Sequence, residues 1–137
     1  MTDIQRVTSV AGVMAADALF DGPVRADWAE KFVREPGHHL LVARVEGTPA
    51  GMVTGVEMTH PDQGTEMFLY ELGVEEEYRG RGIGRGLVLA LAELARTRGC
   101  HGMWVAADTD NEAARATYRS AGGSDDGPTT VFTWELE

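Results

Sequence analysis

The chain has one cysteine, Cys100, and one lysine, Lys31, among its 137 residues, so arginine carries almost all of its positive charge. One cysteine cannot form an internal disulfide, which predicts a reducing, cytoplasmic setting and a structural role for Cys100. No apolar run approaches the roughly 20 residues that a membrane-spanning helix needs. Residues 1–8 also lack a signal-peptide pattern, so we expect no membrane segment.

Clusters of metal ligands and of positive charge are lacking as well. The histidines are scattered without metal-ligand spacing, which predicts no metal site; they are His38, His39, His60 and His101. The formal net charge of -10 argues against nucleic acid as a partner, because neutralising phosphates requires clustered lysine and arginine. The same charge favours a cationic partner, since a cleft of one sign concentrates ligands of the other sign.

An apolar content of 43% and a charged content of 25% are ordinary for a globular protein, and the length predicts one domain over residues 1–137. Alternating and β-favouring patterns predict strands at 3–8, 38–47, 50–60, 65–74, 101–108 and 129–137. Helical periodicity with cap residues predicts helices at 9–20, 25–35, 83–98 and 111–122. Hairpins mixed with βα units indicate the α+β class with a mixed sheet.

The stretch EEEYRGRGIGRG, residues 75–86, leads from a strand into the long apolar helix. The first N–H groups of a helix have no internal partners, and glycines let the backbone approach a ligand closely. With the added arginines, this stretch predicts a binding site for an anion such as phosphate. It lacks the Gly-Lys-Ser/Thr ending of a Walker A loop, and its alternating glycines do not fit the dinucleotide fingerprint. A plain tight turn is the alternative reading.

Two motifs carry a resemblance to a known family. Arg79-x-x-Gly82-x-Gly84 resembles the acetyl-CoA signature of the GNAT superfamily of N-acetyltransferases, Q/R-x-x-G-x-G/A. Asn111-x-x-Ala114-x-x-x-Tyr118-x-x-x-Gly122 is similar to a later motif of that family. Thr117 and Gly123 replace larger apolar residues of the family pattern, which affects packing rather than chemistry.

The resemblance implies a GNAT-like fold, with a mostly antiparallel central sheet splayed between the fourth and fifth strands and about four flanking helices. It implies an acetyl-CoA-dependent N-acetyltransferase that acts on a cationic amine, and a homodimer is expected. Within the superfamily the chain is most similar to type I aminoglycoside 3-N-acetyltransferases, in its segments ALF, FLYELGV and ADTDNEAA. The coenzyme-binding residues that it implies are Leu72, Gly73, Val74, Arg79, Gly80, Arg81, Gly82, Ile83, Gly84, Arg85, Asn111 and Tyr118.

The resemblance also assigns roles in the reaction. Tyr118 would protonate the departing thiolate, because a phenol has a higher pKa than a thiol. The Val74 N–H is the candidate donor to the thioester carbonyl. Glu71 is the candidate base, as the lone charge in an apolar strand in which residues 67, 69, 71 and 73 are expected to share one face. Further candidate contacts to a cationic substrate are Asp108, Asp110, Glu135 and Glu57.

Each role has a structural alternative. Glu71 could pair with an arginine, Tyr118 could be a packed helix residue, and Asp110 could cap the helix that follows it. The acceptor could instead be a polyamine, an amino-acid-like metabolite or a protein amine. A further alternative is a protein without catalytic activity that binds coenzyme A. A nucleic-acid-binding protein is a third reading, and the net charge of -10 argues against it.

Overall fold

The computed structural model describes residues 1–136 of the chain. Within that range the strands form one sheet in the order β1-β2-β3-β4-β5, with β4 and β5 parallel and the other neighbours antiparallel. The strands are β1 (Thr2–Arg6), β2 (His38–Val45), β3 (Thr48–His60), β4 (Gly64–Val74) and β5 (Gly102–Trp104). The helices are α1 (Val10–Ala15), η1 (Asp17–Leu19), α2 (Ala26–Arg34), η2 (Glu76–Tyr78), α3 (Ile83–Thr97) and α4 (Glu112–Ser120).

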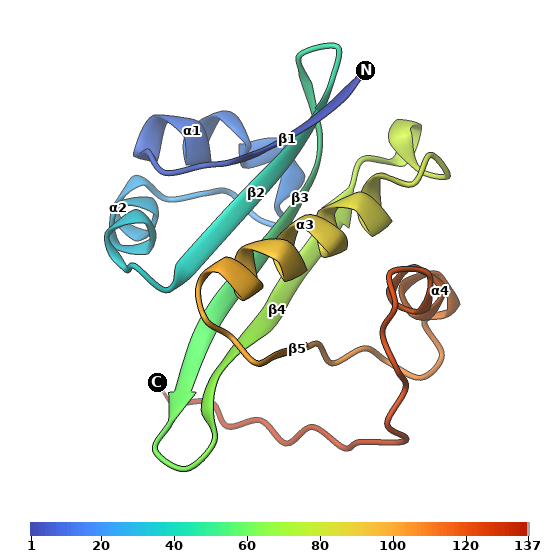
Figure 1. Cartoon of the computed structure of the whole chain (residues 1–137). Helices are drawn as coiled ribbons and strands as arrows, with labels where there is room; N and C mark the ends of the chain where they lie inside the picture. The colour runs from blue at the N-terminus through green and yellow to red at the C-terminus, as the bar shows by residue number, and fades with distance from the viewer. Residues whose placement is uncertain (137) are drawn as a thin grey trace.

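The helices cover the two faces of the sheet unequally (Figure 1). Leu41 of β2 and Val53 of β3 pack against Leu91 and its neighbours on α3. Leu40, on the opposite face of β2, packs against Val13 of α1. This alternation follows from the period of two in a strand. Two apolar cores therefore form, and α3 lies alone over the centre of one face.

Local sequence explains where α3 begins and ends. Its apolar residues recur at helical spacing, so one stripe of the helix is buried against the sheet. Gly99 follows the helix with φ 84°, a conformation that favours glycine and that ends helices. At 15 residues α3 is the longest helix in residues 1–136, and no helix in that range is long and apolar enough to cross a membrane.

The β2–β3 hairpin that the sequence predicts is present, with a tighter turn than expected. Val45 pairs with Thr48, so the loop is Glu46-Gly47, one position earlier than the Gly47–Pro49 turn. Both loop residues have positive φ, 49° and 81°, as a two-residue type I′ turn requires.

A β-bulge in β4 changes the faces on which its residues lie. Thr54 of β3 pairs with Glu71, whereas the next residue, Gly55, pairs with Leu69, so Tyr70 is the extra residue. Before the bulge, Leu69 packs into the α3 core, and after it Leu72 does so as well. The prediction that residues 67, 69, 71 and 73 share one face is therefore wrong, because the inserted residue moves Glu71 to the face opposite α3.

Two predicted strands differ from the structure. The strand expected at 101–108 is only three residues long, and Trp104 is 45% exposed rather than buried. The strand expected at 129–137 is wrong for residues 129–136, which have no regular secondary structure; residue 137 lies outside the described residues. A strand requires a neighbouring edge for its hydrogen bonds, and the sheet of this single chain ends at β5.

Candidate active site

The outer edge of β4 is open beyond β5. Glu66 to Phe68 pair with β5, and the strand then continues to Val74 past the end of its neighbour. Backbone N–H groups of successive strand residues point to opposite edges. The Glu71 N–H donates to Thr54 Oγ1 (3.1 Å) and the Glu75 N–H to the Ala50 carbonyl (2.8 Å), both on the β3 side. The N–H groups of Leu72 and Val74 therefore point to the open edge, as polarisation of a carbonyl there requires.

The N-terminus of α3 lies at the end of this edge, after a loop that glycines shape. Gly80 and Gly82 have φ of 78° and 81°, and no atom lies within 4 Å of a Cβ built at either position. The first N–H of this turn to donate to a backbone carbonyl is that of Gly86, which binds the Gly82 carbonyl (3.0 Å). The preceding N–H groups face outward at the positive end of the helix dipole. This geometry fits a pyrophosphate.

Arginines hold the two sides of the loop. The Arg79 Nε donates to the Val74 carbonyl (3.0 Å), which joins the loop to the end of β4. The Arg85 Nε donates to the Ser120 carbonyl (2.9 Å), which joins α3 to the last turn of α4. These bonds place positive charge beside the free N–H groups, so the loop combines both kinds of anion donor.

Gly84 is where β4, α3 and α4 meet. A Cβ built at this position would lie 3.3 Å from Cγ2 of Thr117 on α4 and 3.7 Å from Cγ2 of Val74. A larger residue would therefore push α4 away from α3 and the open edge. Thr117, which departs from the family pattern, makes the contact on the α4 side.

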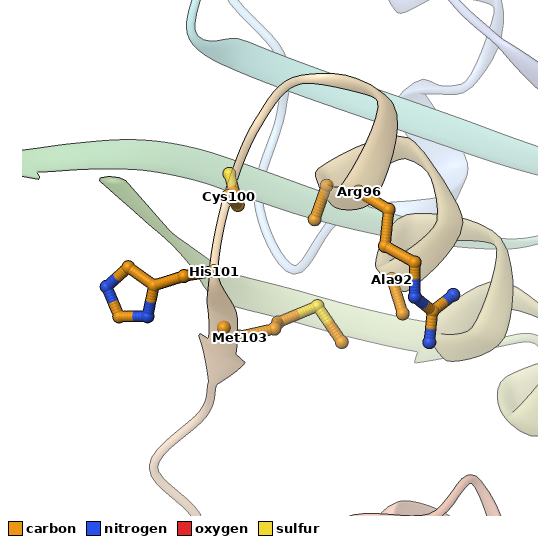
Figure 2. A pocket seen from close by; sticks show the side chains of 7 residues that line it. Ala92, Arg96, Cys100, His101 and Met103 are labelled. Atoms are coloured by element: carbon orange, nitrogen blue, oxygen red, sulfur yellow. The ribbon is translucent and has the colours of Figure 1, made fainter. Parts of the chain in front are cut away.

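A cavity of about 240 Å³ lies between α3, α4 and the diverging ends of β4 and β5, with Leu69, Val105 and Tyr118 in its wall. Burial raises the pKa of the Tyr118 hydroxyl, which keeps the phenol protonated at neutral pH. A smaller hollow of about 190 Å³ adjoins it and contains Cys100 (Figure 2). Burial also raises the pKa of the Cys100 thiol, so this cysteine is not set up as a nucleophile.

Glu71 lies on the other face of the sheet, near the turn after α1. A Cβ built at Gly73 would be 3.4 Å from the Leu19 carbonyl, so β4 passes close to η1 there. Burial raises the pKa of Glu71, and the charge of Asp21, two residues after η1, raises it further. Sequence reasoning did not select Asp21; an acidic residue directly after the apolar segment ALF was the available signal.

Asn111, and not Asp110, caps the N-terminus of α4. The Asn111 Oδ1 accepts from the Ala114 N–H (3.1 Å), so Asn111 is the N-cap. Asp108 and Asp110 are exposed in the segment between β5 and α4. The Asn111 amide N–H groups remain available as donors while its oxygen caps the helix.

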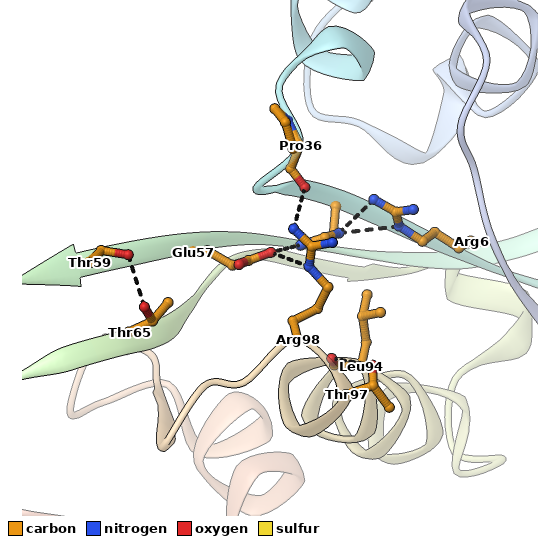
Figure 3. Close-up of polar contacts among 9 residues, drawn as sticks. Arg6, Pro36, Glu57, Thr59, Thr65, Leu94, Thr97 and Arg98 are labelled. Carbon is orange, nitrogen blue, oxygen red and sulfur yellow. Dashed lines mark hydrogen bonds and ion pairs between the residues drawn. The ribbon is translucent and has the colours of Figure 1, made fainter.

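Glu57 belongs to a structural network rather than to the Glu71 side (Figure 3). Its Oε2 accepts from His39 Nε2 (2.6 Å) and from Arg98 Nε (2.7 Å). Arg6 donates to His39 Nδ1, so the ring is neutral with its proton on Nε2. The carboxylate is thus paired at the C-terminal end of α3, which favours a structural role for Glu57 over the predicted substrate contact. Glu135 lies in the exposed segment after α4, where the expected strand is absent.

The model of the acetyltransferase (GNAT) family matches residues 10–122. Thialysine N-epsilon-acetyltransferase of Bos taurus is 31% identical, over 71% of this chain and 62% of the relative. N-alpha-acetyltransferase RimI of Mycobacterium tuberculosis is 37% identical, over 64% of this chain and 52% of the relative. The chain thus spans about half to two thirds of the length of these curated relatives.

Solved structures have the same fold. An aminoglycoside acetyltransferase, meta-AAC0020, from an uncultured soil metagenomic sample in complex with sisomicin superimposes with a TM-score of 0.90 at 18% identity, over 99% of this chain and 97% of that one. AAC(6')-Iy in complex with the bisubstrate analog CoA-S-monomethyl-acetylneamine gives a TM-score of 0.85 at 15% identity, over 99% of both chains. The GNAT fold predicted from the sequence is confirmed, and the chain belongs to the acetyltransferase (GNAT) family, whose enzymes use acetyl-CoA.

Proposed function

We propose that this chain transfers the acetyl group of acetyl-CoA to the 3-amino group of an aminoglycoside, a cationic small molecule. The proposal rests on one observation: residues 71–74 present a backbone N–H at the open edge of β4 and a carboxylate on the face opposite α3. The Val74 N–H points to the open edge beside α3 and α4, while Glu71 lies on the opposite face with a raised pKa. The net charge of -10 and the fold shared with an aminoglycoside acetyltransferase in complex with sisomicin support the acceptor class.

The residues proposed to hold acetyl-CoA line the open edge and the α3 loop. Free N–H groups at Leu72 and Val74 suit an extended amide chain, which would pair with this edge as an added strand does. The outward N–H groups of residues 80–85 and the adjacent arginines suit the pyrophosphate. Asn111 is proposed to contact the coenzyme through its amide N–H groups.

Bound acetyl-CoA supplies the thioester that an acceptor amine attacks. An ammonium group must first lose a proton, and Glu71 is proposed to accept it, directly or through one water. The raised pKa of Glu71 brings its basicity closer to neutral pH, which improves a general base. The Val74 N–H is proposed to donate to the carbonyl oxygen as negative charge develops on it.

Tyr118 is proposed to protonate the departing sulfur, because this residue lines the cavity and its hydroxyl stays protonated. Transfer would be direct within a ternary complex. Cys100 is the one thiol of the chain, and its raised pKa keeps it protonated. A protonated thiol is a poor nucleophile, which argues against an acyl-enzyme intermediate.

The acceptor would bind through carboxylates. Glu71 and Asp21 form an acidic pair beside η1 that suits an ammonium group. Asp108 and Asp110 remain proposed contacts for a second amine, and their exposure leaves them accessible to it.

The test is thiol release from acetyl-CoA with gentamicin-type aminoglycosides, polyamines and peptides, followed by NMR assignment of the acetylated amine. We expect turnover with an aminoglycoside and an acetamide at the 3-amino position. Glu71→Gln should lower kcat/KM by roughly 10²-fold or more, the usual range for a general base. Glu93→Gln on the exposed side of α3 is the matched control and should leave turnover unchanged. Absence of turnover with every aminoglycoside would refute the acceptor assignment.

A peptide amine is the second candidate, because RimI is 37% identical to this chain and is named an N-alpha-acetyltransferase. Turnover with peptides and none with aminoglycosides would select it. If acetyl-CoA binds but no amine is acetylated, the chain is a coenzyme-binding module instead.

A further inference from the structure

The cavity beside Tyr118 continues into a second hollow. The larger space, of about 240 Å³, and the smaller one, of about 190 Å³, share Ala92, Arg96 and Met103 in their walls. Protein interiors are close-packed and contain few voids larger than a water molecule. A continuous space of this size beside a proposed catalytic group therefore suits a bound molecule.

The wall of the larger cavity is mostly hydrocarbon. Its apolar residues come from α3, β4, β5 and the segment after β5, and they include Leu69, Val88, Ala92, Met103, Trp104 and Val105. Met103 and Val105 pack against the α3 core but remain partly uncovered. Figure 2 shows the Met103 side chain extending toward α3, while the His101 ring points away from it. Walls of this kind hold water poorly and favour an apolar guest.

The two hollows follow one stripe of α3. Val88, Ala92 and Arg96 are four positions apart, so their side chains lie on one face of the helix. The stripe is about 12 Å long at about 1.5 Å per residue, the length of a chain of roughly eight C–C bonds. Ala92, at its middle, contributes a single methyl group and leaves the space open. Arg96 ends the stripe at the surface, where it binds Glu93 at 2.8 Å.

The cavity begins where the proposed reaction takes place. Tyr118, the proposed acid for the departing sulfur, is in its wall. Leu69, the first residue of β4 past the pairing with β5, is in the same wall. A site that is limited to acetyl needs a side chain against the acetyl methyl group. Here the stripe of α3 borders a hollow instead.

We propose that this chain also accepts acyl-CoA donors with straight acyl chains of about four to eight carbons, and that the cavity holds the acyl chain. The position of the coenzyme rests on the proposed function, whereas the identity of the acceptor amine does not enter. The chemistry is that of acetyl transfer. The deprotonated amine nitrogen bonds to the acyl carbon, and the C–S bond breaks with its electron pair on sulfur, which takes a proton. The products are an amide and the free thiol of coenzyme A.

Equilibrium binding without an acceptor tests the cavity directly. Calorimetry on the full chain compares coenzyme A, acetyl-CoA, butyryl-CoA and hexanoyl-CoA. Each methylene buried from water raises affinity roughly fourfold, so hexanoyl-CoA should bind at least about tenfold more tightly than acetyl-CoA. Equal affinities refute the inference, while binding of acetyl-CoA still supports the proposed coenzyme site. Failure to bind any of these molecules refutes both.

Two leucine substitutions locate the acyl chain. Ala92→Leu fills the middle of the stripe and should lower the ratio of hexanoyl-CoA to acetyl-CoA affinity roughly tenfold. Ala116→Leu makes the same change at an exposed position of α4 and should keep the ratio. A ratio that survives Ala92→Leu places the acyl chain outside the cavity and refutes the inference. If Ala92→Leu loses its cooperative thermal transition, Ala92→Val and Ala116→Val replace the pair.

Thiol release and mass spectrometry then follow the transfer. An amine that the wild-type chain acetylates should also become hexanoylated, giving a product heavier by four methylene groups. Ala92→Leu should lower kcat/KM with hexanoyl-CoA relative to acetyl-CoA, and Ala116→Leu should not change this ratio. An acetylated product without a hexanoylated one refutes the assignment of the longer donors, even where hexanoyl-CoA binds.

Discussion

Replacing Glu57 by glutamine should destabilise the fold, because Glu57 connects three separate elements. Its carboxylate binds His39 of β2 at 2.6 Å and Arg98, after α3, at 2.7 Å, and its side chain is 14% exposed. Arg98 also donates to the Pro36 carbonyl (3.2 Å), so the same guanidinium holds the start of β2. Glu57→Gln preserves the shape of the side chain and removes its charge.

The magnitude follows from burial. Removing one partner of a buried ion pair costs about 3–5 kcal/mol, because the other charge is left without compensation. The Arg98 side chain is 39% exposed, so water would compensate part of its charge, and the glutamine amide oxygen can still accept hydrogen bonds from His39 and Arg98. We therefore expect a loss of about 2 kcal/mol in the free energy of unfolding. For a chain of this size that lowers Tm by roughly 4–8 °C.

Urea denaturation at pH 7.5, followed by circular dichroism, measures the change. The matched control is Glu93→Gln, because Glu93 contacts Arg96 at 2.8 Å with side chains that are 68% and 71% exposed. An exposed pair at this spacing contributes about 0.5 kcal/mol or less. Equal losses in the two variants would refute the conclusion that burial gives the Glu57 network its strength.

Three further measurements address the rest of the molecule. Burial lowers the pKa of His39 in the folded protein. The contribution of the neutral ring to stability is therefore complete above the unfolded-state pKa of about 6.5 and is lost as the pH falls through the lower folded-state pKa. The free energy of unfolding should decrease from pH 7.5 to 5, and a flat profile would contradict this. Gly84→Val should raise KM for acetyl-CoA at least tenfold by separating α3 from α4, while Gly22→Ala, where a Cβ meets no atom within 4 Å, should not change KM. Tyr118→Phe should lower kcat by roughly 10²-fold with KM for acetyl-CoA unchanged, as assayed by thiol release; an unchanged kcat would remove Tyr118 from the chemistry.

Much of the fold could be predicted because it depends on local pattern. The alternation of apolar residues in β2 and β3 predicts which face of each strand is buried, and the apolar stripe of α3 does the same for the helix. Gly99 marks the end of α3. The turn that leads into α3 was predictable for the same reason, since Gly80 and Gly82 take the positive φ that favours glycine.

Features that depend on pairing were not predictable. The bulge at Tyr70 is set by the register between β3 and β4, and nothing in the alternation of β4 signals it. Glu57 looked available for a substrate because its partners His39 and Arg98 are 18 and 41 positions away in the sequence. Asp21 approaches Glu71 through the packing of η1 on β4, which no local pattern describes.

The bulge at Tyr70 also has a consequence for how specificity can diverge. Because of the inserted residue, Leu69 and Leu72 both face the α3 core while Glu71 lies on the opposite face, so the proposed coenzyme and acceptor sides of β4 share no side chains. Under the proposed function, substitutions at Glu71 or in the segment around Asp21 would change which amine is accepted without disturbing the contacts of Leu72 with the α3 core. Deleting Tyr70 would couple the two sides again, since one half of the strand would have to rotate. Under the proposed function, this single insertion would let acceptor choice diverge while the coenzyme site stays constant.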